Sequence, residues 1–418
     1  MRLPFKIGKE AQYVEVAENN LLGILHSNEI SISLTGEEAV KDALENPIGT
    51  PRLRDIVSPG ERIVIVTSDI TRPLPTAKVM PALLDELYLA GVSPQDITLV
   101  FALGSHRAHT EEERRQLAGE RAWGEIHCVD LDVSHTVSFG TTTRGTPVEI
   151  DRRVAQADRR ICLGNIEYHY FAGYSGGAKA IMPGVSTRNA IQANHSAMVQ
   201  HEACAGRLEG NPVREDIEQA AAMVGVDFIL NVVLDEHKEI IFAAAGDVTQ
   251  AHRAGCKFLD TLYRKNISEK ADIVLVSQGG APKDLNLYQT QKALDNAKHA
   301  VKDGGVIILM GCCKEGLGEK TFAEWIHAAP DAHSLITRIS REFRLGGHKA
   351  AAIAMVLEYA DVYLVSELDA QVVRECFLTP FSSVQEAYDA ALEKCGPDAT
   401  VWAIPHGGSI LPWYGENT

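Results

Sequence analysis

The stretch RIVIVTSDITRPLPTAKVMPALLDELYLAGVSPQDITLVFAL, residues 62–103, decides the fold class of this chain. A β-branched run at 62–67 predicts a buried strand, the apolar spacing at 77–89 predicts a helix, and a second β-branched run at 97–103 predicts another strand. Strand, helix and strand in this order are typical of two parallel strands joined by a crossover helix. The stretch therefore predicts an α/β fold.

The same alternation continues along the chain. Further strands are predicted at 160–163, 228–234, 273–277, 306–310, 362–365 and 401–404, and helices at 212–223 and 287–301. The polar residues 263–270 separate two such blocks and mark a domain boundary. We expect an N-terminal cofactor-binding domain, 1–267, and a C-terminal domain, 268–418, each a mainly parallel sheet flanked by helices. Ligands of such sheets bind beyond the carboxyl ends of the strands, so the site is expected in the interdomain cleft.

The composition disfavours several classes of partner. The 418 residues carry 40 Lys plus Arg against 56 Asp plus Glu, a formal net charge of −16, which argues against nucleic-acid and membrane-surface binding. No uncharged apolar run approaches the roughly 18 residues of a membrane span. The eight cysteines form no C-x-x-C pair and the first residues do not resemble a signal peptide. We therefore expect reduced thiols in a cytoplasmic protein, with a small anionic ligand still compatible with a locally positive cleft.

Two strand ends in the first half carry polar residues. Residues 68–73, SDITRP, precede a predicted helix, whose free N–H groups together with a guanidinium suit a phosphate or carboxylate. Asp69, Thr71 and Arg72 are therefore candidate ligand contacts, although an ordinary turn with a surface ion pair explains them equally well. His106 ends the next strand, where an imidazole can act as acid or base. A lone histidine is more often structural.

Residues 167–179, EYHYFAGYSGGAK, are unlike an ordinary loop, because they combine an imidazole with three tyrosines, three glycines and a lysine. The glycines permit close backbone approach to a ligand, and Lys179 could act as a nucleophile once deprotonated. His195 is a candidate metal ligand, with His169 and His201 as further candidates, but their intervals match no zinc spacing. The alternative is a glycine-rich lid over core aromatics.

A predicted helix in the second half contributes one more pair. Gln289 and Lys292 share one face of the helix starting near residue 287, opposite to its apolar face. An amide and an ammonium near a helix N-terminus could bind a carboxylate. A solvated polar face is the alternative for this pair alone.

Taken together and in this order, the motifs resemble the nickel-pincer lactate racemase family. They are SDITRP at 68–73, GSHR at 104–107, YHYFAGYSGGAK at 168–179, MPG at 182–184, NHS at 194–196 and QTQK at 289–292, with GGHK at 346–349 extending the match. The most specific part is the spacing of His169, Lys179 and His195, which lie ten and then sixteen residues apart as in the family.

The resemblance implies a cofactor and roles for these residues. The cofactor is a nickel-pincer nucleotide, a pyridinium 3-thioamide-5-thiocarboxylate mononucleotide whose sulfur arms hold nickel. Lys179 would be joined to it through the thioamide, His195 would bind the nickel, and His106 and His169 would be the catalytic acid/base pair. The remaining implied contacts are Asp69, Thr71, Arg72, Tyr174, Ser175, Gly176 and Gly177 to the cofactor, and Arg72, Gln289 and Lys292 to the substrate carboxylate.

The implied reaction is racemisation or epimerisation of a lactate-like 2-hydroxy acid by reversible hydride transfer through a 2-keto acid. Direct abstraction of the α-proton beside a carboxylate faces a large barrier, which hydride transfer avoids. Inversion requires two bases, because each face of the planar keto acid needs its own. The alternatives are a pyridoxal phosphate enzyme with Lys179 as its Schiff-base lysine, and a non-catalytic carrier of the pincer cofactor. The partners would be the substrate and the cofactor-building enzymes, with a homodimer as one outcome. The choice of 2-hydroxy acid, the oligomeric state, cofactor loading and domain closure are left open.

Overall fold

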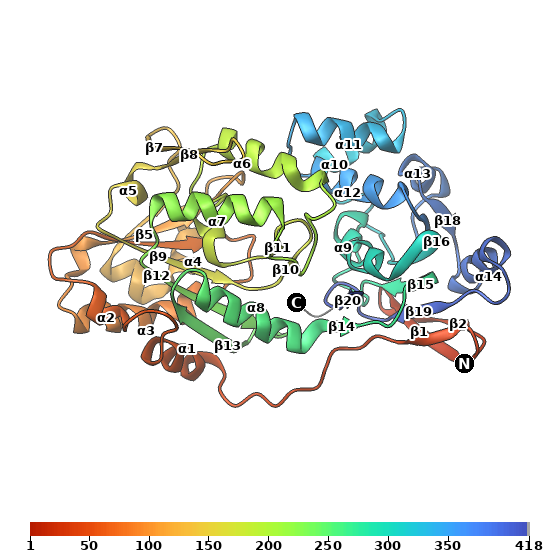
Figure 1. Ribbon diagram of the computed structural model, residues 1–418, viewed down its shortest axis with the longest axis horizontal. Coiled ribbons are helices and arrows are strands. Elements are labelled where there is room, and N and C mark those ends of the chain that lie inside the picture. Colours follow the sequence, from red (N-terminus) through yellow and green to blue (C-terminus); the bar gives the residue numbers. More distant parts are fainter. Residues whose placement is uncertain (416–418) are drawn as a thin grey trace. The chain divides into compact units, whose positions relative to one another are not determined.

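The computed structural model describes residues 1–415, and its contacts divide the chain into two compact units (Figure 1). The central unit is Ile30–Thr261, and the terminal unit combines Met1–Glu29 with Leu262–Thr418. This division differs from the predicted domains in assigning the first 29 residues to the C-terminal half. The physical reason is strand pairing, which a sequence read from one end does not reveal: the N-terminal strands complete a sheet and core of the terminal unit.

The central unit is built on one six-stranded sheet in the order β13-β12-β9-β4-β5-β6. All neighbours are parallel except β12 and β13, which pair antiparallel. The strands are β4 (Ile63–Ser68), β5 (Ile97–Ala102), β6 (His127–Asp130), β9 (Arg159–Asn165), β12 (Phe228–Leu234) and β13 (Ile240–Gly246). Two antiparallel pairs lie outside it: β7 (Thr136–Thr141) with β8 (Pro147–Asp151), and β10 (Tyr168–His169) with β11 (Gly173–Tyr174).

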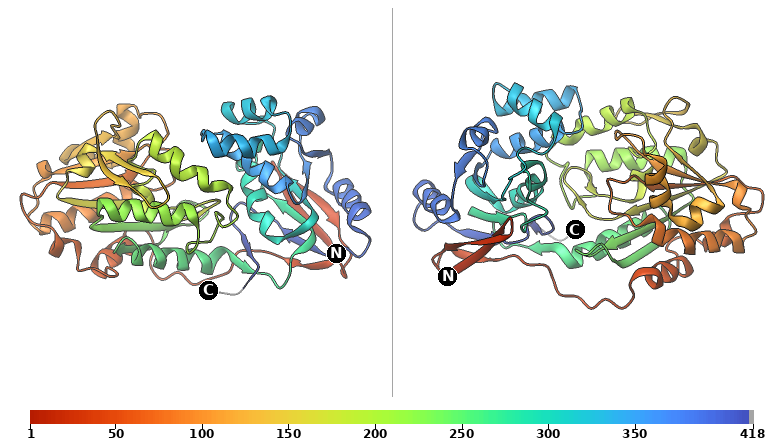
Figure 2. Two further views of the ribbon diagram at one scale, coloured as in Figure 1. Left: turned by 45° about the horizontal axis from the view of Figure 1, so that its top comes forward. Right: turned by 180° about the vertical axis from the view of Figure 1, so that it is seen from behind.

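Helices cover both faces of this sheet (Figures 1 and 2). They are α1 (Gly36–Glu45), α2 (Leu53–Ile56), α3 (Thr76–Leu89), α4 (Glu111–Glu125), α5 (Arg152–Ala155), α6 (Arg188–His195), α7 (Pro212–Val224) and α8 (Gln250–Tyr263). One core joins α1 to α4 with alternate strand residues such as Ile63, Leu99 and Ile161. Their neighbours Val64, Val100 and Cys162 are buried on the other face. Burial of both faces explains the nearly continuous β-branched runs.

The terminal unit holds a second six-stranded sheet in the order β18-β17-β16-β15-β19-β3, and every pair in it is parallel. Its strands are β3 (Leu21–Ile24), β15 (Ala271–Ser277), β16 (Val301–Met310), β17 (Asp361–Val365), β18 (Thr379–Phe381) and β19 (Val401–Ile404). The helices are α9 (Leu287–Ala297), α10 (Lys320–Ala328), α11 (Ala332–Arg341), α12 (Gly347–Leu357), α13 (Ala370–Glu375) and α14 (Val384–Cys395). A short parallel pair joins β14 (Arg264–Asn266) to β20 (Leu411–Trp413).

The N-terminal hairpin shows why the first residues belong to this unit. Strands β1 (Arg2–Ile7) and β2 (Glu10–Glu15) pair antiparallel, and Leu3, Phe5 and Val14 enter the core formed with β15, β16 and α14. Burial of alternate residues in β1 gives the hairpin one apolar face, which needs a partner core.

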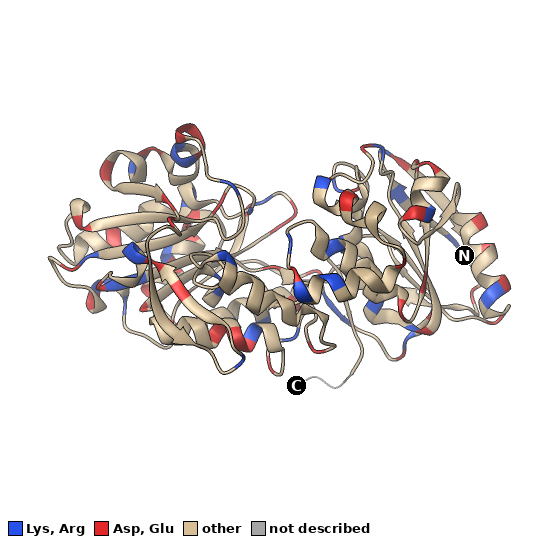
Figure 3. Cartoon of the chain, turned by 90° about the horizontal axis from the view of Figure 1, so that it is seen from above, with Lys and Arg blue, Asp and Glu red and all other residues tan. Residues whose placement is uncertain are grey.

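The predicted fold class, two mainly parallel sheets flanked by helices, is confirmed. The predicted helix at 287–301 ends earlier, since α9 stops at Ala297 and a 3-10 turn, Lys298–Ala300, leads into β16. Across residues 1–415, every helix is too short or too polar to span a bilayer. Acidic and basic residues are interspersed over both units (Figure 3).

Candidate functional site

The glycine-rich segment after β9 forms a compact hairpin followed by a 3-10 turn. Tyr168 pairs with Tyr174 and His169 with Gly173, and the turn Gly177–Ala180 carries Lys179. Gly173 has a φ of 75°, and a Cβ built there would lie 2.0 Å from the carbonyl oxygen of Arg207. Only glycine fits this position, because both the backbone conformation and the neighbouring carbonyl exclude a side chain.

Gly173→Ala should therefore destabilise the central unit. The Cβ collides with a backbone carbonyl, so we expect a loss of about 3 kcal/mol or more in the free energy of unfolding, measured by urea denaturation. Gly60→Ala is the matched control, since Gly60 has a φ of 83° with nothing within 4 Å of a built Cβ. It should lose only about 1–2 kcal/mol from the backbone conformation. Equal losses in the two variants would refute the steric argument.

The ring of Phe171 is the common neighbour of three predicted site residues. His169 packs edge-on against it with the ring centroids 4.5 Å apart, and His195 does so at 5.0 Å. The Nζ atom of Lys179 lies 5.8 Å from the same centroid. Residues ten and sixteen positions apart are therefore brought to one place. The sequence motifs assign no role to Phe171, although it lies within the glycine-rich segment 167–179.

The electrostatics of this group favour neutral forms. Burial among protein atoms lowers the pKa of the Lys179 ammonium well below its ordinary value, and the charges of Arg214 and Arg72 lower it further. Burial likewise lowers the pKa of His169 well below its ordinary value, with Lys179, Arg72, His195 and Arg214 adding to the effect. Both side chains keep some exposed surface, so a neutral amine and a neutral imidazole face a partly open site.

His106 belongs to a second group at the carboxyl ends of β4 and β5, where Ser68 pairs with Ala102. Its Nδ1 lies 2.5 Å from Oδ2 of the buried Asp69, and Thr71 donates to the other carboxylate oxygen at 2.8 Å. Burial alone would raise the pKa of Asp69, but the hydrogen bond and charge of His106, with Thr71 and Arg72, outweigh it and lower the pKa. The His106 Nδ1–H donates to the carboxylate, which leaves Nε2 as a proton acceptor.

His109 holds the loop that carries Asp69. Its Nε2 accepts from the backbone N–H of Ile70 at 3.1 Å, and its Nδ1–H donates to Asp130 at 2.7 Å. Both ring nitrogens of this buried side chain are therefore used inside the protein. His109 is structural, whereas His106 is partly exposed.

Arg72 connects the two groups electrostatically. Its charge contributes to the pKa shifts of Asp69, His169 and Lys179 alike. Its side chain is exposed, and its backbone N–H donates to the Asp69 carbonyl at 3.1 Å. The loops that carry the two groups also contact each other directly, since the Gly104 N–H, beside His106, donates to the Gly184 carbonyl, beyond Lys179, at 3.0 Å. Arg72 is therefore available to bind an anion beside both groups.

Buried side chains at the N-cap and in the first turn of α7, and on α8, hold the carbonyls of the glycine-rich segment. Asn211 donates to the Phe171 carbonyl at 3.0 Å, and Arg214 donates to those of Ala172, at 3.0 Å, and Tyr174. His252 donates to the Ser175 carbonyl at 2.8 Å. The start of α7 at Asn211-Pro212 is readable from sequence as an N-cap followed by proline. A fully buried arginine that binds backbone carbonyls has no such signal.

The four other predicted cofactor contacts in this segment make hydrogen bonds within the protein or adopt glycine-specific backbone conformations. The Tyr174 hydroxyl donates to Asp260 at 2.8 Å, and the Ser175 hydroxyl donates to the Asn165 carbonyl at 2.7 Å. Gly176 has a φ of 74° and Gly177 a φ of 57°, and the Gly177 N–H donates to a buried Asn231 at 2.7 Å. These contacts shape the segment, and binding of a cofactor by the four residues stays a prediction.

Gln289 and Lys292 lie on α9 of the terminal unit, as the spacing predicted. Asn286 caps this helix by accepting from the Gln289 N–H at 3.0 Å, and Lys292 is exposed. The buried Lys349 of α12 donates to the Tyr288 carbonyl at 2.5 Å and lies 4.1 Å from the Tyr288 ring centroid. Gln289 is half-buried whereas Lys292 is exposed, and Lys349 holds the start of that helix.

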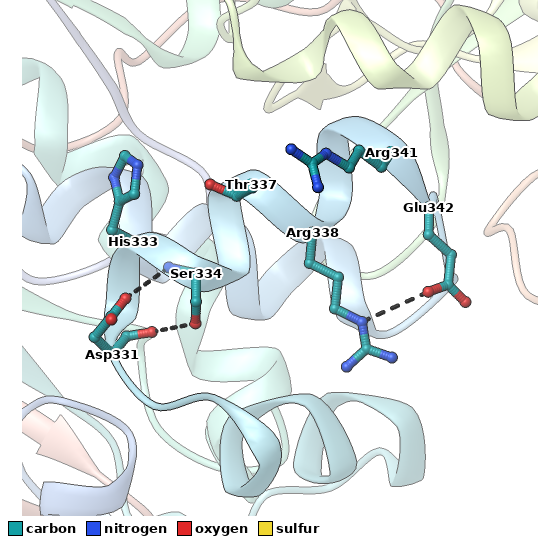
Figure 4. Close-up of a pocket in the computed structure, with 7 residues that line it drawn as sticks. All are labelled: Asp331, His333, Ser334, Thr337, Arg338, Arg341 and Glu342. Atoms are coloured by element: carbon teal, nitrogen blue, oxygen red, sulfur yellow. Dashed lines mark hydrogen bonds and ion pairs between the residues drawn. The ribbon is translucent and has the colours of Figure 1, made fainter.

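An open hollow of about 540 Å³ lies elsewhere on the terminal unit, over α11 (Figure 4). Asp331 caps α11 by accepting from the Ser334 N–H at 2.8 Å, and Arg338 pairs with Glu342 at 3.6 Å. These residues use one another as partners on an exposed helix. None of the residues predicted to carry chemistry lines this hollow.

Comparison with known proteins gives consistent results over nearly the whole chain. Residues 7–206 match a model of the lactate racemase N-terminal domain, and residues 267–411 match one of the lactate racemase C-terminal domain. A lactate racemase from Thermoanaerobacterium thermosaccharolyticum is 35% identical over 416 residues, covering 97% of both chains. A lactate racemase from Lactiplantibacillus plantarum is 32% identical over 410 residues, covering 95% of this chain and 96% of that protein.

Solved structures agree with these matches. The lactate racemase apoprotein from T. thermosaccharolyticum superposes with a TM-score of 0.87 at 34% identity, covering 99% of this chain and 100% of that one. A Thermotoga maritima protein superposes with a TM-score of 0.62 at 21% identity, covering 92% of this chain and 100% of that one, and so shares the fold.

Proposed function

Since this chain belongs to the lactate racemase family and is an isomerase, we propose that it interconverts the enantiomers of a lactate-like 2-hydroxy acid with a nickel-pincer nucleotide. The observation that carries this proposal is the gathering of His169, Lys179 and His195 around Phe171. It supplies a nucleophilic amine, a nitrogen donor and a base within one site. Arg72 adds a positive charge for an anionic substrate or cofactor.

The residues present fit such a cofactor. The lowered pKa of Lys179 favours the neutral amine, the form that can be joined to the nucleotide as an amide-like bond. His195 offers one nitrogen donor. Within residues 1–415, no cluster of three or more His, Cys, Asp or Glu could hold a metal. Nickel at His195 would therefore need the sulfur donors that the cofactor brings.

When bound, the electron-poor pyridinium ring accepts a hydride and gives it back. The chain must then handle the hydroxyl proton and the charge. His106 is arranged as a base, because Asp69 holds the proton on Nδ1 and leaves Nε2 ready to accept the hydroxyl proton of one enantiomer. Removing that proton as the hydride departs leaves a planar 2-keto acid.

His169 serves the opposite face in this proposal. Its Nδ1 accepts from the Ala172 N–H at 3.3 Å, so its proton lies on Nε2 and can hydrogen-bond the carbonyl oxygen of the keto acid. In this tautomer Nε2 can only donate. To take the hydroxyl proton of the other enantiomer, the ring must give up the Ala172 contact and carry its proton on Nδ1, while its lowered pKa disfavours the imidazolium. Binding of the substrate carboxylate by Arg72, Gln289 and Lys292 remains the prediction from their positions in the family motifs.

The proposal also covers the partner enzymes of the protein and its cellular compartment. The cofactor-building enzymes are its expected partners. All eight cysteines are free thiols, which suits a reducing compartment, and we propose the cytoplasm.

The test is to produce the protein with and without the cofactor-building enzymes. With co-expression, we expect an adduct on Lys179 by peptide mass spectrometry, about one nickel per chain by elemental analysis, and racemisation of lactate or another 2-hydroxy acid by chiral chromatography. Without co-expression, we expect none of the three. Adduct and nickel without racemisation of any 2-hydroxy acid would indicate a carrier. Pyridoxal phosphate in place of nickel and sulfur would refute the proposed cofactor.

A further inference from the structure

A buried hydrogen-bonded chain runs behind His195. The Nδ1 atom of His195 lies 2.9 Å from Oδ1 of Asn194. The Nδ2 atom of Asn194 donates to Oδ2 of Asp216, on α7, at 2.7 Å and to the Val213 carbonyl at 3.3 Å. His195, Asn194 and Asp216 are 6%, 1% and 2% exposed, so water does not compete for these bonds.

Asp216 is the fixed end of the chain. Thr142 donates to its Oδ1 at 2.5 Å, and Thr146 donates to its Oδ2 at 2.6 Å. Both threonines lie between β7 and β8 and are buried. With Asn194, they give the carboxylate three donors from two separate segments. A carboxylate so engaged acts as an acceptor toward Asn194 and fixes the orientation of its amide.

This orientation determines which nitrogen of His195 carries the proton. The Asn194 amide nitrogen faces two acceptors, Asp216 and Val213, so its oxygen faces His195. An amide oxygen only accepts, and the His195 Nδ1 must therefore be the donor. In a neutral imidazole the lone pair is then on Nε2, and this is the nitrogen that can coordinate a metal.

We propose that Asn194 and Asp216 are positioning residues that fix His195 in the Nδ1–H tautomer and so present Nε2 to nickel. The proposal rests on the proposed function for the identity of the metal, but its tautomer part concerns this chain alone. Outer partners of metal-binding histidines orient the ring in this way, and their loss typically costs about 10- to 100-fold in metal affinity. If Asn194 and Asp216 only held α6 against α7, the tautomer of His195 would not depend on which of these two residues donates and which accepts in their hydrogen bond.

The experiment exchanges the amide and the carboxylate. Asp216→Asn removes the anion that orients the Asn194 amide, and Asn194→Asp sets two carboxylates against each other. The double variant Asn194→Asp/Asp216→Asn restores one donor and one acceptor, with the introduced carboxylate accepting from His195. The cycle separates the pair interaction from the effect of each change alone. Asn20→Ala is the matched control, because Asn20 is a buried asparagine of the terminal unit that donates to the Pro397 and Ala399 carbonyls.

Two measurements are made on each variant. The first is the tautomer of His195 in the protein without cofactor, from imidazole ¹⁵N shifts, with the His195 signal assigned by its absence in His195→Gln. The second is nickel retained per Lys179 adduct in the loaded protein under chelator competition. We expect Nδ1–H in the wild type, the double variant and Asn20→Ala. Asp216→Asn should show mixed tautomers and nickel affinity lowered about 10- to 100-fold, with recovery to within about threefold in the double variant. Asn194→Asp should keep the Nδ1–H tautomer, because its carboxylate still accepts from Nδ1.

An Nε2–H tautomer in the wild type, or an Asp216→Asn variant that keeps the wild-type tautomer and nickel affinity, would overturn the proposal. If a single variant does not fold, the wild type and the double variant still decide the outcome. If the wild type takes up no nickel, the proposed function fails, and the tautomer measurement on the cofactor-free protein still tests the chain of hydrogen bonds.

Discussion

Lys179→Met is expected to reduce racemisation to the rate of the uncatalysed control, because the side chain can no longer be joined to the cofactor. Methionine matches lysine closely in length but has no amine. Peptide mass spectrometry of protein made with the cofactor-building enzymes should show the unmodified 179 peptide. Elemental analysis should show nickel reduced from about one per chain to background, since the cofactor brings the other nickel donors.

The stability of this variant separates a lost attachment from a lost fold. Burial opposes the Lys179 ammonium, as the direction of its pKa shift shows, and Arg214 and Arg72 add like-charge repulsion. An apolar side chain of similar size avoids both costs. The free energy of unfolding of the cofactor-free protein should therefore be unchanged or higher in Lys179→Met, measured by urea denaturation.

Lys78→Met is the matched control. Lys78 lies on α3 of the same unit, its side chain is 54% exposed, and its partner Glu239 is exposed as well. Exposed ion pairs contribute little, so adduct, nickel and activity should equal those of the wild type. Adduct formation in Lys179→Met would show that another residue carries the cofactor.

The fold could be predicted from the sequence where one signal dominated. The β-branched runs of β4, β5, β9, β12, β15 and β16 predicted strands because burial on both faces requires continuous apolar side chains. The hairpin β1–β2 and the edge strand β13 were not predicted. The sequence of β13, IIFAAAG, suits a helix as well as a strand, and its antiparallel pairing with β12 is a tertiary choice.

The candidate site, too, could be predicted from the sequence only in part. Motif spacing located His169, Lys179 and His195, and the structure brings all three to Phe171. The contact between Asp69 and His106 depends on the adjacency of β4 and β5, so the sequence did not reveal it, and ligand binding by Asp69 stays a prediction. The buried Arg214 was missed because charged residues on a helix normally indicate a solvated face.

His106→Ala and His169→Ala should each lower steady-state racemisation by about 10²- to 10⁴-fold, the usual contribution of a general acid or base. Both variants should keep the Lys179 adduct and about one nickel per chain, because neither residue is proposed to hold the cofactor. His135→Ala is the control, since His135 is 64% exposed and pairs with Asp132 on the surface of the same unit. Chiral chromatography measures the rates.

The decisive property of the two variants is the enantiomer that each can still oxidise. If His106 serves one face of the substrate and His169 the other, then removing one base leaves the half-reaction of the other intact. In a single turnover, quenched with acid, the wild type should form keto acid from both enantiomers. His106→Ala should form it from one enantiomer and His169→Ala from the opposite one. Keto acid from the same enantiomer in both variants would refute the two-base scheme, because that scheme gives each imidazole the hydroxyl proton of one enantiomer only.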